Sequence, residues 1–161
     1  MTEEEEAMFL EELGGFAGDY LSLRDDPEAF LSAILENGEL REALARADTS
    51  PLLRSWFTPR DEGEGGWVAD GQRSGAIGKS AAGTEWSFLG VHDQNETFNG
   101  IRATGREVEV RGYTLMSIES TDEGESRVQL RRYVDWVGLY GQLGLSVNWR
   151  VPLPHEVPDL P

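Results

Sequence analysis

RRYVDWVGLYGQLGL, residues 131–145, changes its periodicity partway along. Up to Val134 the residues alternate as they do in a strand, and from Asp135 the apolar residues recur at helical spacing. Aspartate is favoured at such a joint because its side-chain oxygen can accept a hydrogen bond from the first turn of the helix. The same position could also hold a catalytic carboxylate at the rim of a sheet. The stretch therefore predicts a final strand and a short helix, with Asp135 in one or both of these roles.

A run of antiparallel strands precedes that joint. REVEVRGYTLMSIES, residues 106–120, reads as a long strand, TDEGES as a hairpin loop around Gly124, and RVQLRRYV, residues 127–134, as the partner strand. EWSFLGV, residues 85–91, predicts a further strand. Alternation within the long strand places on one face Val108, Val110, Thr114, Met116 and Ile118.

The first part of the chain is predicted to be helical. Residues 3–57 include EEEEAMFLEEL, a helix from Asp26-Pro27 to Asn37-Gly38, the short helix ELREALARA, and a fourth helix that starts at Pro51. Residues 58–84 are rich in Gly and small residues and predict a loop, a weak strand or a flap. We expect one α+β domain, residues 1–161, with helices at 1–57, this flap at 58–84, a sheet plus short helix at 85–147, and a Pro-rich tail at 148–161.

Charge and composition exclude several classes of function. The net charge is −16, with 30 acidic and 14 basic residues, so the surface should repel phosphate backbones and anionic lipids. There is no Cys and there are only two His, which argues against a metal centre, and no motif predicts a cofactor. The sequence has no signal-peptide pattern and no long apolar run, so we expect a cytoplasmic protein. An acidic, lysine-poor composition is what a protein in a high-salt cytoplasm would carry. A GC-rich coding sequence, which favours Arg over Lys, would also explain the shortage of lysine.

Two blocks of sequence are similar to a known family. FNGIRATGREVEVRG, residues 98–112, resembles the Phe-x-Gly-Ile-x-x-Thr-Gly-Arg-x-Val…Gly stretch of SnoaL-like polyketide cyclases and their ester-cyclase relatives. RRYVDWVGLYGQLGL resembles the final strand and Leu-rich helix of that family. The resemblance covers about residues 85–145 and implies a nuclear-transport-factor-like α+β cone. Such cones are often dimeric through the sheet and hold a ligand cavity between sheet and helices.

The resemblance also implies which residues carry chemistry. Asp135 stands at the family's usual acid/base position, where a buried carboxylate removes and returns a proton next to a carbonyl. Gly90-Val91-His92 is the nearest match to the family's Gly-Thr-His motif, which makes His92 the second catalytic candidate. The alternative for His92 is a solvated side chain beside Asp93. The sequence departs from the family pattern at Arg131, where a Trp is usual.

Strand parity leaves the orientation of the last strand open. Arg131, Tyr133 and Asp135 share one row, and Val128, Leu130, Arg132 and Val134 share the other. The resemblance aims the Asp135 row into the cavity, where Arg131 would hold an anionic group. Periodicity instead favours the Val/Leu row beneath the helices, with the Asp135 row facing solvent or a partner subunit. The candidate ligand contacts are Arg131, Tyr133, Tyr113 and Trp86.

The sequence therefore predicts a SnoaL-like small-molecule protein with a ligand pocket. Its expected chemistry is cofactor-independent acid/base catalysis of the cyclase, isomerase or hydrolase type, on a hydrophobic metabolite for which an anionic group is one option. The alternative is a non-catalytic ligand-binding or dimeric interaction protein on the same scaffold. We expect a homodimer and neither a nucleic-acid nor a membrane partner.

Overall fold

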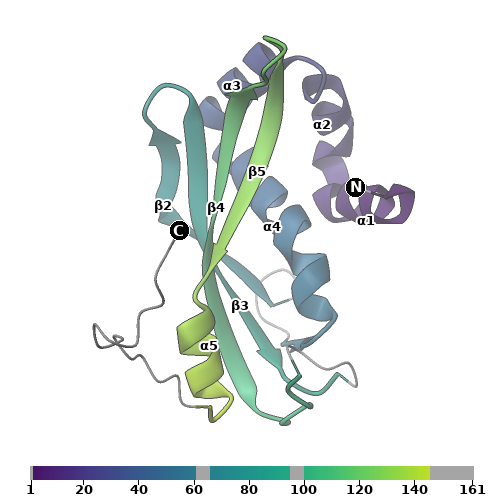
Figure 1. Ribbon diagram of the computed structural model, residues 1–161, viewed down its shortest axis with the longest axis vertical. Helices are drawn as coiled ribbons and strands as arrows, with labels where there is room; N and C mark the ends of the chain where they lie inside the picture. The colour runs from purple at the N-terminus through teal and green to yellow at the C-terminus, as the bar shows by residue number, and fades with distance from the viewer. Residues whose placement is uncertain (1, 61–65, 95–99, 146–161) are drawn as a thin grey trace, which may run out of the picture.

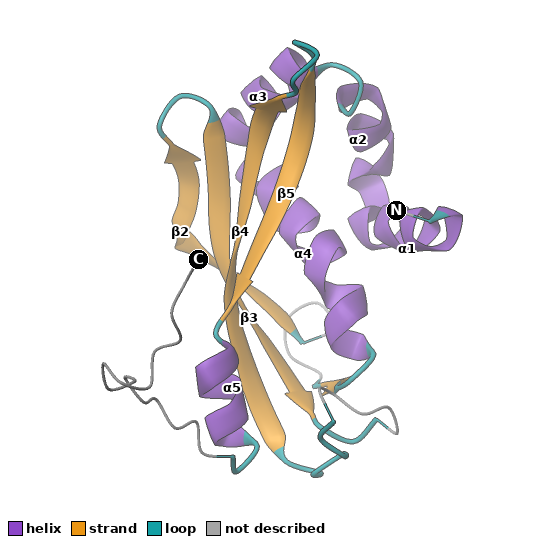
Figure 2. Cartoon of the chain, in the orientation of Figure 1, coloured by secondary structure: helices purple, strands orange, loops and turns teal. Residues whose placement is uncertain are grey.

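Five α-helices and a five-stranded sheet make up the described part of the chain, residues 2–60, 66–94 and 100–145 of a computed structural model (Figure 1). The helices come first, apart from the last one. The third and fourth helices pack on a curved antiparallel sheet, and the first two pack against those helices (Figure 2). This is the α+β arrangement that the sequence predicts. The predicted Pro-rich tail, residues 148–161, lies outside the described residues, as do residues 61–65 of the predicted flap.

The N-terminal helices follow local sequence signals. Helix α1, Glu3–Leu13, begins with a capping box in which Thr2 and Glu5 satisfy each other's backbone N–H groups. A short 3-10 turn, Gly14–Phe16, leads into α2, Ala17–Leu23. Helix α3, Pro27–Glu36, starts as predicted, with Asp26 as its cap. Its end is fixed from outside, because Arg41 donates hydrogen bonds to the carbonyl oxygens of Ile34 at 2.6 Å and Leu35 at 3.3 Å.

Helix α4, Gly38–Arg54, is continuous where the sequence predicts two helices. Pro51 lies inside it and has no N–H to give to the carbonyl of Ala47, so one helical hydrogen bond is missing. Thr49 and Ser50, the two residues before this proline, are buried. Leu44 and Leu53, on either side of this turn, are both fully buried. Their burial in a common core explains why the helix continues through the proline.

The sheet is antiparallel throughout. Strand β3, Ala81–Val91, pairs with β4, Glu107–Ser120, which pairs with β5, Ser126–Val134. The other edge of β3 carries the short β1, Thr58–Pro59, and then β2, Trp67–Ile77. Strand β2 lies within residues 58–84, the stretch predicted as a loop, weak strand or flap. Helix α5, Trp136–Gln142, follows β5 and contacts β4, as the change of periodicity predicts.

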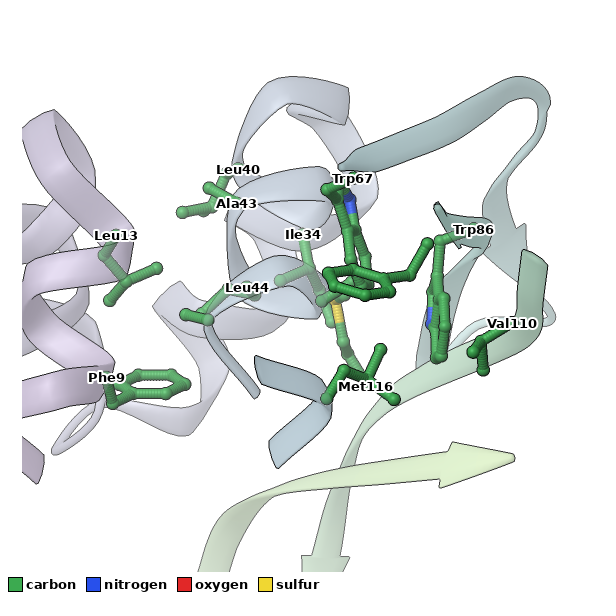
Figure 3. Close-up of a cluster of buried hydrophobic side chains, with 14 of the residues drawn as sticks. Phe9, Leu13, Ile34, Leu40, Ala43, Leu44, Trp67, Trp86, Val110 and Met116 are labelled. Carbon is green, nitrogen blue, oxygen red and sulfur yellow. The ribbon is translucent and has the colours of Figure 1, made fainter. Parts of the chain in front are cut away.

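Even-numbered residues of β3, β4 and β5 form the inner face of the sheet, which the helices cover, and odd-numbered residues form the outer face. The inner face joins the helices in one hydrophobic core, part of which is drawn in Figure 3. The predicted row of the long strand is confirmed, with Val108, Val110, Thr114 and Met116 buried. In this core the rings of Trp67 and Trp86 stack with their centroids 4.6 Å apart.

Two glycines make room for aromatic rings on opposite faces of the sheet. A Cβ at Gly83 would lie 2.2 Å from the Tyr113 hydroxyl on the outer face and 2.7 Å from the carbonyl oxygen of Thr114. A Cβ at Gly112 would lie 2.4 Å from the indole ring of Trp86. Each ring therefore lies flat across a strand only because the neighbouring residue has no side chain.

Candidate functional site: a pocket between helices and sheet

Asp135 lies at the N-terminus of α5 and is exposed to solvent. Its Oδ1 accepts a hydrogen bond of 2.9 Å from the N–H of Gly138, so it caps the helix, which is one of the two predicted roles. The carboxylate lines a shallow depression on the outer face of the sheet, together with Arg111, Tyr113 and Tyr133. The predicted acid/base role depends on burial that this position does not provide, and it stays a prediction.

His92 lies in the core rather than in a solvated loop. Its Nδ1 accepts a hydrogen bond of 3.1 Å from the Thr104 N–H and lies 3.0 Å from the Thr104 hydroxyl, while its ring packs against Phe57. Its Nε2 is buried and has no hydrogen-bond partner in the described part of the chain. Burial lowers the pKa of His92, with a smaller opposing effect from Asp93.

The structure does not bring Asp135 and His92 together. The His92 N–H binds the carbonyl of Arg106, and the Asp135 N–H binds that of Arg111. Five residues of extended chain separate these two acceptors, or about 16 Å at the usual rise of a strand. Asp135 is also exposed whereas His92 is buried. The two side chains therefore cannot act on one small substrate in this arrangement.

The four predicted ligand contacts divide between the two faces. Arg131, Tyr133 and Tyr113 lie on the outer face, where Arg131 pairs with Glu119 at 2.6 Å and burial raises the pKa of Tyr113. Trp86 lies on the inner face, fully within the core, and donates a hydrogen bond of 3.0 Å to the Thr114 hydroxyl. The register thus settles the orientation that the sequence left open, because the Val/Leu row faces the helices.

A more enclosed cavity, of about 400 Å³, lies between α1, α4 and β5, and we call it the α1–α4–β5 pocket. In Figure 1, α4 lies between α1 and β5, and it contacts both of them. The volume of the pocket is within the range of small-molecule sites. The wall is apolar over most of its extent, with four polar side chains. The lining residues are Glu5, Met8, Phe9, Ala47, Asp48, Pro51, Leu52, Ser55 and Arg132.

An ion pair stands in this apolar wall. The Nε of Arg132 lies 3.4 Å from Oδ2 of Asp48, and the side chains are 40% and 16% exposed, respectively. Oδ2 accepts no hydrogen bond from the described residues, so its contact with Arg132 is electrostatic. Burial raises the pKa of Asp48, and the charge of Arg132 only partly offsets this effect. The pocket therefore offers one accessible cation and one carboxyl group that can change its protonation state.

Two larger or more open depressions offer less. One of about 520 Å³, between the start of α3 and the β4–β5 hairpin, is lined by three carboxylates, Asp26, Glu28 and Glu125, and by no cation. The depression beside Asp135 is lined by outer-face residues of adjoining strands. Neither combines an apolar wall with a charged group in the way that the α1–α4–β5 pocket does.

Sequence reasoning missed Asp48 and Arg132, although each left a signal. Arg132 interrupts the Val128, Leu130 and Val134 row, which is the row that faces the helices. Asp48 falls four residues after Leu44, on the side of α4 that turns toward the protein interior. A charge on the apolar row of each of two neighbouring elements indicates that the charges meet. The predicted break in α4 hid this pattern.

Within the described residues, no three His, Asp or Glu side chains come together as metal ligands would. None of the helices in this part of the chain has the length and apolar character needed to cross a bilayer.

Comparison with known proteins finds no family model and no curated protein that matches the chain. Among solved structures, a SnoaL-like polyketide cyclase from Jannaschia sp. CCS1 aligns with a TM-score of 0.38 and 11% identity, over 75% of this chain and 93% of that one. TsrD from Streptomyces laurentii aligns with a TM-score of 0.38 and 19% identity, over 89% and 98%. The first bears the family description that the sequence resemblance suggested. Likenesses this distant carry no argument about chemistry, which must come from the residues of this chain.

Proposed function

We propose that this protein binds a small organic molecule with an apolar body and an anionic group in the α1–α4–β5 pocket. The observation that carries the proposal is Arg132, a partly exposed cation in the largely apolar wall of a cavity of about 400 Å³. Guanidinium groups suit carboxylates because their N–H donors match the two oxygens. The apolar side chains of Met8, Phe9 and Leu52 would cover the body of the ligand.

Two adjacent arginines give this proposal a matched test. Octanoate is the probe, octan-1-ol is its neutral counterpart, and binding is measured by calorimetry. Arg132→Met should weaken octanoate binding about tenfold or more, equivalent to about 1.4 kcal/mol, while octan-1-ol binding changes little. Arg131→Met should leave both affinities unchanged, because Arg131 pairs with Glu119 on the outer face. Equal losses in the two variants, or no binding of either probe, would refute the proposal.

A second candidate function is acid/base catalysis at Asp48, favoured by the raised pKa of this buried carboxyl group. The carboxylate would take a proton from a carbon next to a carbonyl, and the electrons of that C–H bond would move into an enolate. Arg132 would stabilise the negative enolate oxygen, and Asp48 would return the proton. Exchange of the α-protons of octan-2-one for deuterium, followed by NMR, tests this. Exchange no faster than in buffer would rule it out.

We also propose that the protein forms a homodimer through the outer face of the sheet. Exposed apolar side chains on this face support the proposal, among them Val68, Ile77 and Tyr133, which is 53% exposed. Sedimentation velocity should report the dimer mass, and Tyr133→Glu combined with Val68→Glu should shift it to the monomer. Leu21→Glu, at another exposed apolar position, on α2, is the control and should remain dimeric. A monomeric wild-type protein at micromolar concentration would contradict the proposal.

A further inference from the structure

We propose that the α1–α4–β5 pocket takes up a proton when it binds an organic anion, and that the proton goes to Asp48. This inference rests on the proposed ligand site and adds a property to it. The geometry that carries it is that the Asp48 carboxylate and the bound anion would share one guanidinium group, that of Arg132. Arg132 already faces the Asp48 carboxylate at 3.4 Å, so an anion that reaches Arg132 also reaches Asp48. Two negative groups around one cation in a partly buried site repel each other, and a proton on one of them relieves the repulsion.

Asp48 is the member of this group best placed to accept the proton. It is only 16% exposed, and its Oδ2 has no hydrogen-bond donor among the described residues, so the charge on that oxygen is stabilised mainly by the ion pair with Arg132, which the ligand would share. A protonated Oδ2 could instead donate a hydrogen bond to the incoming anion. Burial already raises the pKa of this carboxyl group before any ligand binds. The proton comes from solvent, and no other bond forms or breaks.

The other charged groups around Asp48 are otherwise engaged. Glu5 faces the pocket from α1, but its carboxylate accepts a hydrogen bond of 2.8 Å from the Thr2 N–H, which lowers its pKa. Glu12, further along α1, pairs with Arg54 and does not line the pocket. From β5 the facing group is Arg132 itself, which keeps its charge. Among the described residues, Asp48 is therefore the group whose protonation changes with the ligand.

Such coupling has a definite sign. The bound state holds more protons than the free state, so affinity for an anion must rise as the pH falls. The rise is confined to the window between the pKa of Asp48 in the complex and its lower pKa in the free protein. Within that window the affinity changes by up to about tenfold per pH unit for one proton. Above the window Asp48 stays ionised in both states, and below it Asp48 is protonated in both.

Calorimetry with octane-1-sulfonate provides the test, because this probe stays ionised at every pH used. Titrations in buffers of different ionisation enthalpy give the number of protons taken up by the wild-type protein, without any variant. We expect a net uptake approaching one proton within the window, and tighter binding at lower pH. Asp48→Asn should abolish the uptake and bind the sulfonate more tightly near neutral pH. Glu119→Gln, which removes a carboxylate paired with Arg131 on the outer face, should behave as wild type.

The outcomes separate this inference from the site on which it rests. Binding that is lost in Arg132→Met but shows no proton uptake and no pH dependence would overturn the coupling and leave the ligand site standing. Uptake that persists in folded Asp48→Asn would overturn the assignment to Asp48. Absence of sulfonate binding at any pH, in wild type and Asp48→Asn alike, would overturn the ligand site itself.

Discussion

His92 shows how a single buried group makes the stability of this protein depend on pH. Its imidazole is fully enclosed, accepts a hydrogen bond from the Thr104 N–H through Nδ1, and has its pKa lowered by burial. The neutral form is therefore the one that the folded protein accommodates. Because the unfolded chain binds a proton at a higher pH than the folded chain does, acid favours unfolding.

We predict the consequence for the free energy of unfolding. The contribution of His92 is complete above its unfolded pKa, about 6.5, and is lost as the pH falls toward its lower folded pKa. The slope can reach about 1.4 kcal/mol per pH unit for this one group. Denaturant titrations across this range should show a flatter dependence for His92→Gln. His155→Gln, at the only other histidine of the chain, is the control. Identical slopes for wild type and His92→Gln would disprove the assignment.

Asp135 is a second case at the residue scale. Its role as a helix cap can be tested separately from any role in ligand binding. Replacement by Ala removes the hydrogen bond to the Gly138 N–H and should lower the free energy of unfolding by about 1 kcal/mol, as for other N-caps. Octanoate binding should not change, because Asp135 lies on the opposite face of the sheet from Arg132 and does not line the α1–α4–β5 pocket. Denaturant melts and calorimetry on the same variant measure both quantities. A loss of binding with unchanged stability would instead place Asp135 in the ligand site.

At the scale of elements, the packing of the sheet requires glycine at the positions where an aromatic ring lies across a neighbouring strand. Gly83 in β3 and Gly75 in β2 are register partners, yet their surroundings differ. A Cβ at Gly83 would lie 2.7 Å from the backbone oxygen of Thr114 as well as against Tyr113, whereas nothing lies within 4 Å of a Cβ at Gly75. The strand cannot relieve the first contact by turning a side chain.

Alanine at the two positions should therefore change the stability of the protein differently. Gly83→Ala should destabilise the protein by about 1–3 kcal/mol, as overpacking in a well-filled site does. Gly75→Ala should be neutral or slightly stabilising, because alanine restricts the unfolded chain. Thermal melts of the two variants measure the difference. Similar melting temperatures for both would mean that Tyr113 does not lie across Gly83 as described.

The elements also show what the sequence could and could not predict. The β4–β5 hairpin and the cap of α5 are set by alternation and by local capping residues, so both were predictable. The continuity of α4 was not, because Pro51 signals a break and only the burial of Leu44 and Leu53 in a common core overrides it. Strand β2 could be predicted only as one of several alternatives, a weak strand, for a similar reason. Its Gly-rich sequence has weak strand preference, and pairing with β3 supplies the order.

On the scale of the whole molecule, the candidate site depends on contacts between distant parts of the chain. Asp48 and Arg132 are far apart in sequence and meet only when α4 packs on the inner face of β5. No local pattern reports such a pair, although a charge on an apolar row is a hint of one. The resemblance instead directed attention to Asp135 and its row, and the register places that row on the outer face. The fold was thus more predictable than the site.

Locating a bound ligand tests the central claim most directly. Crystals grown with a fatty carboxylate that carries a bromine at the end of its chain would reveal the bromine by anomalous scattering. We predict a peak within the α1–α4–β5 pocket near Met8 and Leu52, with the carboxylate against Arg132. A peak on the outer face beside Tyr113 and Asp135, or an α1–α4–β5 pocket that stays empty at saturating ligand, would contradict the claim.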